Sequence, residues 1–465
     1  MANPMTDAEE RHARLAALDR AHVWHPFTQM STWLEPLPGD EPVIIDHATG
    51  SWLFDTKGRK YLDGVSSLWV NVHGHRKLEI DSAIKLQLSS VAHTTLLGLA
   101  SPPSIELAAE LVRRAPRFEG QPRLNRVFYS DSGSTAVEVA LKMAFQHWKL
   151  RGKEKKRKFV ALGDAYHGDT IGSVSVGGVD LFHEIFRPLL FDVLRIPTPY
   201  AYRWPTGAHH CLEAAAQAAE ALIEGRRDEI AAVIVEPLVQ GAAGMIVHPP
   251  GYLKRVERAC RNNDVLLICD EVATGFGRTG TLFASEQEFV VPDLMCVAKG
   301  LTGGYLPLAA TLATEHVFES FLGPFESKRT LFHGHSYTGN ALACAAALAS
   351  LRIFDEEQTL VHVNNMAARL AEALAPLARH PHVGDVRQRG LLLGLELVRD
   401  RRTAEEYGYG DRVGHKVCLA ARKREVMLRP LGNVVVLVPP LSIQPQEVDL
   451  LAEAVLASID EVCGA

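Results

Sequence analysis

LLICDEVATGFGRTG, residues 266–280, is the stretch that indicates the architecture of this chain most directly. An apolar run of strand length ends there on the acidic pair Asp270 and Glu271, and a weaker apolar run, LMCVAKG, ends on Lys299 among glycines. Short apolar runs bounded by polar or glycine residues predict strands that are buried on both faces. Because open parallel sheets bind ligands at the carboxyl ends of their strands, we expect Asp270 and Lys299 to share one edge.

Similar runs on both sides of this stretch alternate with helical patterns. RVFYSDSGS, KFVALGDAYHGD and IAAVIVEPLVQG end on polar or glycine residues, and CLEAAAQAAEALIEG and GYLKRVERACRNN show helical periodicity. The alternation predicts an α/β domain with a mainly parallel sheet flanked by helices, which we place at residues 81–345. Residues 1–80 contain a predicted hairpin around DTKG, and residues 346–465 mix helices and strands. We expect both ends of the chain to build a smaller α+β domain together.

The composition restricts the class of function. The chain has 465 residues, above the usual size of one core, and its net charge of -6 gives no attraction to nucleic acid or anionic lipid. No apolar stretch has the length of a membrane span, and the polar N-terminal residues do not resemble a signal peptide. The seven cysteines form no CxxC pattern. We expect a cytoplasmic protein with reduced thiols and with neither nucleic-acid nor membrane partners.

Gly275, Gly277 and Gly280 fit the GxGxxG pattern of dinucleotide-binding sites. Such a site needs a helix that begins at the third glycine and an acidic residue at the end of a second strand. Here TLFASEQEFVVPDL starts with β-formers and soon reaches Pro292, and the acidic pair precedes the glycines. The sequence therefore argues against a nucleotide site.

A pyridoxal phosphate site gives these residues one common explanation. An amine that bonds to the cofactor's aldehyde must be neutral and shielded from water, a task that fits Lys299. The cofactor also needs a carboxylate at its ring nitrogen, a flat partner for its ring and donors for its phosphate. Asp270 would supply the carboxylate, and Tyr166 would stack on the ring. The turn from Ser132 to Ser134 precedes a predicted helix, whose free N–H groups favour a phosphate.

CDEVATGFGRTG followed by AKGLTGG resembles the signature of the class III aminotransferases, which are pyridoxal phosphate enzymes of fold type I. Blocks from HVWHPFTQM to LRPLGNVVVLVPP resemble the branch of this family that acts in biotin synthesis, and they span nearly the whole chain. The resemblance implies a large domain with a seven-stranded type of sheet and a homodimer. It implies ping-pong transfer of an amino group to 8-amino-7-oxononanoate, giving 7,8-diaminononanoate, with S-adenosylmethionine or L-lysine as the donor.

The resemblance also implies roles for single residues at the cofactor. Lys299 would bind the cofactor and move the proton, Asp270 would pair with the pyridinium, and Tyr166 would stack on the ring. Gly133 and Ser134 would hold the phosphate, beside Ser132 at the start of the same helix.

Further roles concern the substrates and the second subunit. Ser336 in HGHSYTGN would reach the phosphate of the neighbouring subunit's cofactor, and Gly334 in the same motif would contact substrate. Trp69 would form a wall of the pocket, and Arg429 would face the substrate carboxylate. Phe27 stands where the branch that uses S-adenosylmethionine typically has tyrosine, so it bears on the choice of donor. As structural alternatives, Trp69 would belong to the core and Arg429 to an ion pair.

Other assignments stay open. Arg278 would either touch substrate or pin a loop, and Glu236 and Gln240 would either adjoin the cofactor or be structural. The His-x-His pairs at 73–75 and 333–335 have no third metal ligand at a credible spacing.

A broad ω-amine or ω-amino-acid transaminase is the alternative function within the same class. A lysine-dependent aldolase would need neither the phosphate cradle nor the carboxylate. A binding or regulatory protein on this scaffold would be expected to lack the lysine or its partners.

Overall fold

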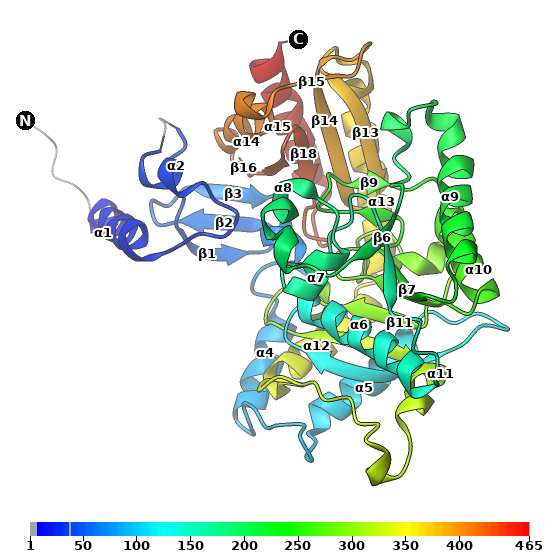
Figure 1. Cartoon of the computed structure of the whole chain (residues 1–465). Helices are drawn as coiled ribbons and strands as arrows, with labels where there is room; N and C mark the ends of the chain where they lie inside the picture. Colours follow the sequence, from blue (N-terminus) through cyan, green and yellow to red (C-terminus); the bar gives the residue numbers. More distant parts are fainter. Residues whose placement is uncertain (1–6, 37–38, 465) are drawn as a thin grey trace, which may run out of the picture.

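A seven-stranded sheet forms the centre of the molecule (Figure 1). The computed structural model describes residues 7–36 and 39–464. In sheet order the strands are β4 (Leu124–Ser130), β12 (Ala309–Thr314), β11 (Leu294–Val297), β10 (Leu266–Asp270), β7 (Ile230–Val235), β5 (Lys158–Leu162) and β6 (Val193–Ile196). All neighbouring pairs are parallel except those of β12, which runs antiparallel to β4 and β11. The predicted mainly parallel sheet is confirmed.

Helices cover both faces of this sheet, which explains why its strands are apolar along their whole length. On β10, Leu266 packs in the cluster beneath α6 (Gly133–Leu150). The next residue, Leu267, points to the opposite face and packs with α9 (Cys211–Gly225) and α10 (Tyr252–Asn262). Burying one such leucine contributes about 1.5–3 kcal/mol, so a strand buried on both faces holds its register firmly.

Beside the short pair β8 (Val239–Gln240) and β9 (Ile246–Val247), two further sheets lie outside the central one, and the first of them combines strands from both ends of the chain. The first has the order β1 (Ile45–Thr49), β2 (Trp52–Asp55), β3 (Lys60–Asp63) and β16 (Val426–Met427). Strands β2 and β3 form the hairpin predicted around DTKG, and β16 pairs in parallel with β3. The second contains β13 (Val383–Arg389), β14 (Leu392–Asp400), β18 (Val434–Leu437), β17 (Arg429–Leu431) and β15 (Glu405–Glu406). The N-terminal hairpin therefore depends on a strand from the C-terminal region.

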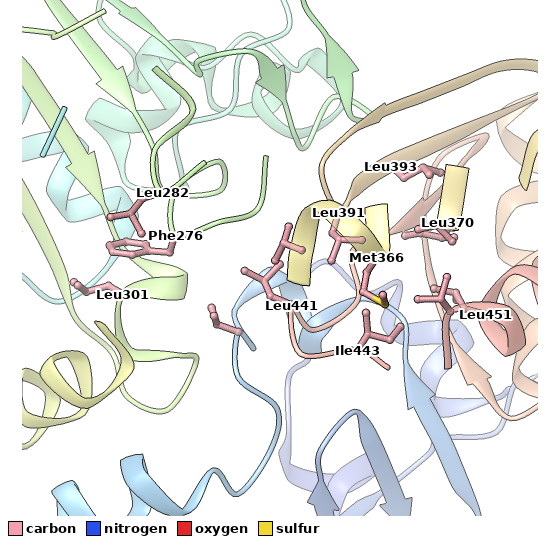
Figure 2. Packing of buried hydrophobic residues seen from close by; sticks show 14 of the residues in the cluster. Phe276, Leu282, Leu301, Met366, Leu370, Leu391, Leu393, Leu441, Ile443 and Leu451 are labelled. Atoms are coloured by element: carbon pink, nitrogen blue, oxygen red, sulfur yellow. The ribbon is translucent and has the colours of Figure 1, made fainter. Parts of the chain in front are cut away.

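The largest core cluster connects these regions. Figure 2 shows Phe276 and Leu301, which follow strands of the central sheet, in one cluster with Leu391 and Met366 of the C-terminal region. The packing is continuous across residue 345 and therefore marks no boundary there. The domain boundaries at 80 and 345 remain predictions.

The remaining helices surround these sheets (Figure 1). Apart from the short left-handed segment α3 (Ser66–Trp69), those described are α1 (Asp7–His22), α2 (Met30–Leu34), α4 (Leu78–Leu88), α5 (Pro102–Arg114), α7 (Ile171–Val176), α8 (Asp180–His183), α11 (Glu315–Phe318), α12 (Ala341–Glu356), α13 (Thr359–Leu374), α14 (Val413–Arg422) and α15 (Pro445–Cys463). Across the described ranges, none of the helices combines the length and the apolar character that crossing a bilayer requires.

Candidate active site

A cavity of about 690 Å³ opens at the carboxyl ends of the central strands. Strand β10 ends there on Asp270, β11 leads into Lys299, and β4 leads into the turn before α6. The predicted residues that line the cavity are Trp69, Ser132, Gly133, Ser134, Tyr166, Asp270 and Lys299. The topology of a parallel sheet thus brings together residues that lie far apart in the sequence.

Lys299 begins a short 3-10 turn, Lys299–Thr302, with its own φ at 40°. The following Gly300 allows close packing, because a Cβ there would lie 2.9 Å from Cβ of Phe276. The Nζ atom lies 5.2 Å from the ring centroid of Trp69. Desolvation by the surrounding protein lowers the pKa of the Lys299 ammonium, and the carboxylates of Asp270 and Glu236 oppose this effect only in part. A lowered pKa raises the fraction of neutral amine, the form that bonds to an aldehyde.

Asp270 is buried, and its carboxylate has defined partners. The Oδ1 atom accepts a hydrogen bond from the backbone N–H of Val272 at 3.0 Å, and Oδ2 lies 2.7 Å from Nδ1 of His167. The other ring nitrogen of His167 is buried without a hydrogen-bonding partner among the described residues. His167 was not among the predicted site residues, although it stands beside Tyr166 in the AYHGD turn. The imidazole orients the carboxylate toward the cavity.

The start of α6 forms a cradle next to Asp270. Ser132 caps the helix by accepting a hydrogen bond from the N–H of Thr135. A Cβ on Gly133 would lie 2.6 Å from Cγ1 of Val272, so the backbone approaches the end of β10 as only glycine allows. Ser134 is held in place, because its Oγ accepts from the N–H of Thr170 at 3.0 Å.

These features fit pyridoxal phosphate. The cavity contains an amine of lowered pKa, a buried carboxylate and a helix start whose Gly133 and Ser134 N–H groups have no acceptor among the described residues. Tyr166 lines the same cavity, and its OH donates to Asp169 at 2.8 Å.

Trp69 ends a left-handed turn. The φ angles are 49° at Ser66, 49° at Ser67, 84° at Leu68 and 68° at Trp69. Each residue other than glycine costs about 1–2 kcal/mol in this conformation, so the surrounding structure must hold the turn. The Trp69 ring is buried in a small apolar cluster and also lines the cavity, so it is at once a core residue and a wall.

Glu236 lines the cavity, whereas Gln240 does not. The Glu236 carboxylate accepts hydrogen bonds from the N–H groups of Tyr166 at 3.0 Å and Gly241 at 2.9 Å. Burial raises the pKa of Glu236 to about 7. Gln240 is buried and interacts with His248 at 3.1 Å. Of this pair, only Glu236 lines the cavity.

The raised pKa of Glu236 predicts a pH-dependent stability. The folded carboxyl holds its proton up to about pH 7, whereas the unfolded one loses it near pH 4.5. The folded state therefore binds more protons in this window, and the free energy of unfolding falls as pH rises through it, by on the order of 3 kcal/mol from this group. Urea unfolding of the cofactor-free protein at pH 4.5 to 7 should show a smaller slope for Glu236→Gln than for the parent. Equal slopes would contradict this assignment.

Arg429 and Phe27 line a neighbouring cavity of about 1130 Å³. Aromatic rings lie between linings of the two cavities: the Phe27 ring of the second cavity lies 5.4 Å from that of Phe182, which lies 6.2 Å from the Tyr166 ring of the first. The Arg429 guanidinium is half-buried, and among the described residues it has neither an ion pair nor a hydrogen bond. Burial lowers its pKa, and the nearby Tyr166 opposes that effect. The structural ion pair considered for Arg429 is therefore not seen, and its donors are available to a ligand.

Three further predicted residues lie outside both cavities. Gly334 and Ser336 belong to an exposed loop, where the carbonyl of Ser336 lies 2.8 Å from the His93 ring. Arg278 is buried and donates to the carbonyl oxygens of Pro439 and Asn71, both at 2.6 Å. Burial lowers the pKa of Arg278 to about 9. Arg278 thus joins two loops by hydrogen bonds. It lines neither cavity, so the structure gives no support for contact with substrate.

Neither rival kind of site finds support in the geometry. After Gly280 the described chain forms the 3-10 helix Ala284–Glu288, whereas a dinucleotide site would require an α-helix there. Residues 7–36 and 39–464 contain no cluster of three or more His, Cys, Asp or Glu side chains suited to a metal ion.

Comparisons with known proteins agree with this geometry. A family model described as aminotransferase class-III matches residues 37–459. Adenosylmethionine-8-amino-7-oxononanoate aminotransferase of Nitratidesulfovibrio vulgaris is 56% identical over 97% of this chain and 82% of the relative. The Geobacter sulfurreducens protein of the same name is 50% identical over 96% of this chain and 97% of the relative.

Solved structures of two kinds are similar. The Methanocaldococcus jannaschii protein of the same name has a TM-score of 0.91 and 43% identity, with 97% of this chain and 99% of that chain covered. The ω-transaminase of Pseudomonas jessenii in complex with PMP has a TM-score of 0.91 and 31% identity, with 96% of this chain and 98% of that chain covered.

Proposed function

The chain belongs to the class III aminotransferases, and from this premise we propose that it transfers an amino group to 8-amino-7-oxononanoate, giving 7,8-diaminononanoate in biotin synthesis. It is a pyridoxal-phosphate-dependent aminotransferase. The observation that carries the choice of substrate is the identity of 50% or more, over nearly the whole chain, to relatives named for this acceptor. The amino donor in those names is adenosylmethionine, and we propose it for this chain too.

The cofactor, when bound, supplies an electron sink that makes the C–H bond beside the substrate nitrogen acidic. Lys299 would hold it and would move the proton, because desolvation keeps the amine available in its neutral form. Asp270, oriented by His167, would pair with the ring nitrogen. The first turn of α6, at Gly133 and Ser134, would hold the phosphate. Tyr166 would stack on the ring.

The carboxylate end of the substrate would be recognised in the second cavity. Arg429 offers a planar guanidinium without a counter-ion among the described residues, which suits the carboxylate of the oxononanoate. Trp69 lines the first cavity beside Lys299, where it would form a wall around the reacting end of the substrate. Phe27 would contact the donor, where it provides an apolar ring without a hydroxyl.

A donor screen tests the proposal. The cofactor-loaded protein would receive 8-amino-7-oxononanoate with S-adenosylmethionine, with L-lysine or with a simple ω-amine, and diaminononanoate would be quantified by mass spectrometry. We expect product with S-adenosylmethionine. Product with lysine alone would support the proposed acceptor and replace the proposed donor. Phe27 would then distinguish chains that use lysine. Transfer from ω-amines to pyruvate without any diaminononanoate would overturn the proposal in favour of an ω-transaminase.

We also propose a cytoplasmic homodimer with shared active sites. Large apolar side chains are exposed on two adjoining segments, 86–99 and 332–337, with Leu97 90% exposed and Phe332 77% exposed. The segments meet where the ring of His93 lies 5.0 Å from that of Tyr337. An exposed apolar patch of this kind favours association with a second copy. Ser336 lies in this patch, so it would reach the partner's cofactor.

A mixing experiment distinguishes a shared site from a self-contained one. Ser336→Asp places a negative charge near the phosphate and should weaken cofactor binding roughly 5- to 1000-fold, from ~1–4 kcal/mol of repulsion. Co-refolding of Ser336→Asp with Lys299→Ala should restore activity to about a quarter of the parent's, because each mixed dimer of a two-fold assembly contains one intact site. No recovery from demonstrated mixed dimers would show that Ser336 serves its own subunit.

A further inference from the structure

We propose that Asp63 is a positioning residue for the substrate pocket: its carboxylate holds the left-handed turn from Ser66 to Trp69 in shape and thereby holds the Trp69 ring beside Lys299. The inference rests on the proposed function in one respect, because Trp69 is taken as a wall of the substrate pocket. Asp63 itself lines neither cavity and acts through the turn.

The contacts of Asp63 converge on the turn. It is the last residue of β3 and is completely buried. The Oδ1 atom accepts from the backbone N–H of Ser67 at 2.9 Å, and Oδ2 accepts from the Ser67 hydroxyl at 2.8 Å. The ring of His75 lies 3.0 Å from the same Oδ2 through its Nε2. One carboxylate therefore fixes both the backbone and the side chain of a left-handed residue.

Backbone hydrogen bonds also close the turn: the N–H groups of Leu68 and Trp69 donate to the carbonyl of Val65 at 3.1 and 2.8 Å, and that of Val70 donates to the carbonyl of Ser66 at 3.0 Å. Two side-chain anchors add to them. The first residue of the turn is anchored by the Ser66 hydroxyl, which donates to the carbonyl of Val438 at 2.6 Å. Ser67 is exposed, and Leu68 is 49% exposed, so neither side chain is locked by packing. Non-glycine residues prefer other backbone conformations, so the turn would relax if its anchors were removed. Of the two side-chain anchors, Asp63 is the one that acts at the middle of the turn.

The position of the Trp69 ring depends on this turn. On one side the ring packs against Gly241, where a Cβ would come within 3.2 Å of Cζ3. On the other side the ring centroid lies 5.2 Å from Nζ of Lys299. A change in the backbone at residues 66–69 would therefore move the ring relative to the reacting amine and change the width of the pocket.

Asp55 provides a matched control. It is buried at the end of the neighbouring strand β2, and its carboxylate accepts from the N–H groups of Lys57 and Arg59 at 2.9 Å and from the hydroxyl of Tyr61 at 3.0 Å. Its contacts hold a hairpin turn that lines neither cavity. Asp55 also pairs with the guanidinium of Arg59 at 2.8 Å, whereas Asp63 has the His75 ring as its neighbour. Asp55→Ala and Asp63→Ala thus each remove one buried carboxylate that holds a turn, and only the second faces the Trp69 turn.

Fluorine NMR of cofactor-loaded protein containing 5-fluorotryptophan tests the proposal without reference to activity. The chain has six tryptophans, and the Trp69 signal is assigned by its loss in Trp69→Phe. We expect Asp63→Ala to shift or broaden the Trp69 signal. The conservative Asp63→Asn should leave this signal closer to its position in the parent protein. Asp55→Ala should move only the signal of Trp52, which lies on the same strand.

An unmoved Trp69 signal in folded Asp63→Ala would overturn the proposal. Should that variant fail to fold, Ser67→Ala takes its place, because it removes one of the hydrogen bonds to Asp63 at an exposed position. A Trp69 signal that shifts in Ser67→Ala would support the proposal, and one that stays at the parent's position would overturn it.

Kinetics then separate positioning from a general loss of stability. At a temperature well below unfolding, Asp63→Ala should raise KM for 8-amino-7-oxononanoate about tenfold with a smaller change in kcat. In a Trp69→Ala background the same change should leave KM unaltered, because the residue through which Asp63 acts is gone. An equal rise of KM in both backgrounds would overturn the proposal. If neither parent nor variants aminate this substrate, the proposed function fails, and the NMR result still decides the role of Asp63.

Discussion

Replacement of Lys299 by alanine is expected to lower kcat for amino transfer by on the order of 10⁴-fold, the full contribution of a positioned acid–base group. Lys299 is the only lysine among the described residues that line the two cavities, and desolvation favours its neutral form. In its proposed role, its removal would delete both the covalent anchor of the cofactor and the group that moves the proton. The measurement is single-turnover formation of product, together with borohydride reduction and mass spectrometry to locate the cofactor on residue 299 of the parent.

Two variants sharpen this expectation. Lys299→Arg keeps a cation in the cavity but should be equally inactive, because a guanidinium does not give up its proton near neutral pH. Lys156→Ala removes another buried lysine, which donates to the carbonyl oxygens of Arg227 and Asp264 at 2.6 Å. That change should lower the melting temperature and leave kcat unaltered. Comparable rates for Lys299→Ala and the parent would refute the assignment of the catalytic amine.

Asp270→Asn is expected to lower kcat by about 10²- to 10⁴-fold. A neutral amide cannot stabilise a protonated ring nitrogen, so the cofactor would lose much of its capacity to withdraw electrons. The amide has nearly the same shape as the carboxylate and can still accept from the N–H of Val272. The change therefore tests the charge of Asp270 with little change in packing. Rates are to be compared with saturating cofactor, so that weaker binding does not enter the result.

The adjacent Glu271 supplies the control, because its carboxylate points away from the cavity. It accepts from the N–H groups of Ala284 at 3.0 Å and Ser285 at 2.8 Å and from the hydroxyl of Thr274 at 2.6 Å. Glu271→Gln leaves one of these donors without an acceptor and should cost about 1–3 kcal/mol of stability while kcat stays the same. N-methylpyridoxal phosphate, whose ring nitrogen is permanently cationic, should restore activity to Asp270→Asn. Failure of that rescue would argue against a role at the ring nitrogen.

The position of the site could be predicted from the sequence because it depends on where strands end. Asp270 and Lys299 each follow an apolar run, and the parallel pairing of β10 with β11 places them at one edge. The start of α6 could be predicted for a similar reason, since a serine cap before a helical pattern is a local signal. Local patterns of this kind are strong enough to determine which side chains share an edge.

Other features depend on contacts between distant segments, which local patterns do not show. His167 interacts with Asp270 across 103 positions of the chain, and Arg278 reaches the carbonyl of Asn71 across 207. The left-handed turn before Trp69 contains no glycine, so its residue types give no sign of its backbone. Ser336 lies away from the cavities of its own chain, and its proposed role needs a second subunit. The positions and proposed roles of these residues follow from tertiary and quaternary contacts.

The parallel pairing of β3 with β16 has a consequence for the order in which the chain folds during synthesis. Leu62 pairs with Val426 and Asp63 with Met427, so β3 has a free edge until the ribosome has made the C-terminal region. At roughly 5–20 residues per second that wait lasts roughly 20 to 70 s, long enough for all strands of the central sheet to emerge first. The segment that carries Trp69 therefore completes its surroundings last. A nascent chain stalled before residue 426 would contain the lysine and the phosphate cradle, but it would lack the finished pocket wall and would offer an open strand to chaperones or to aggregation.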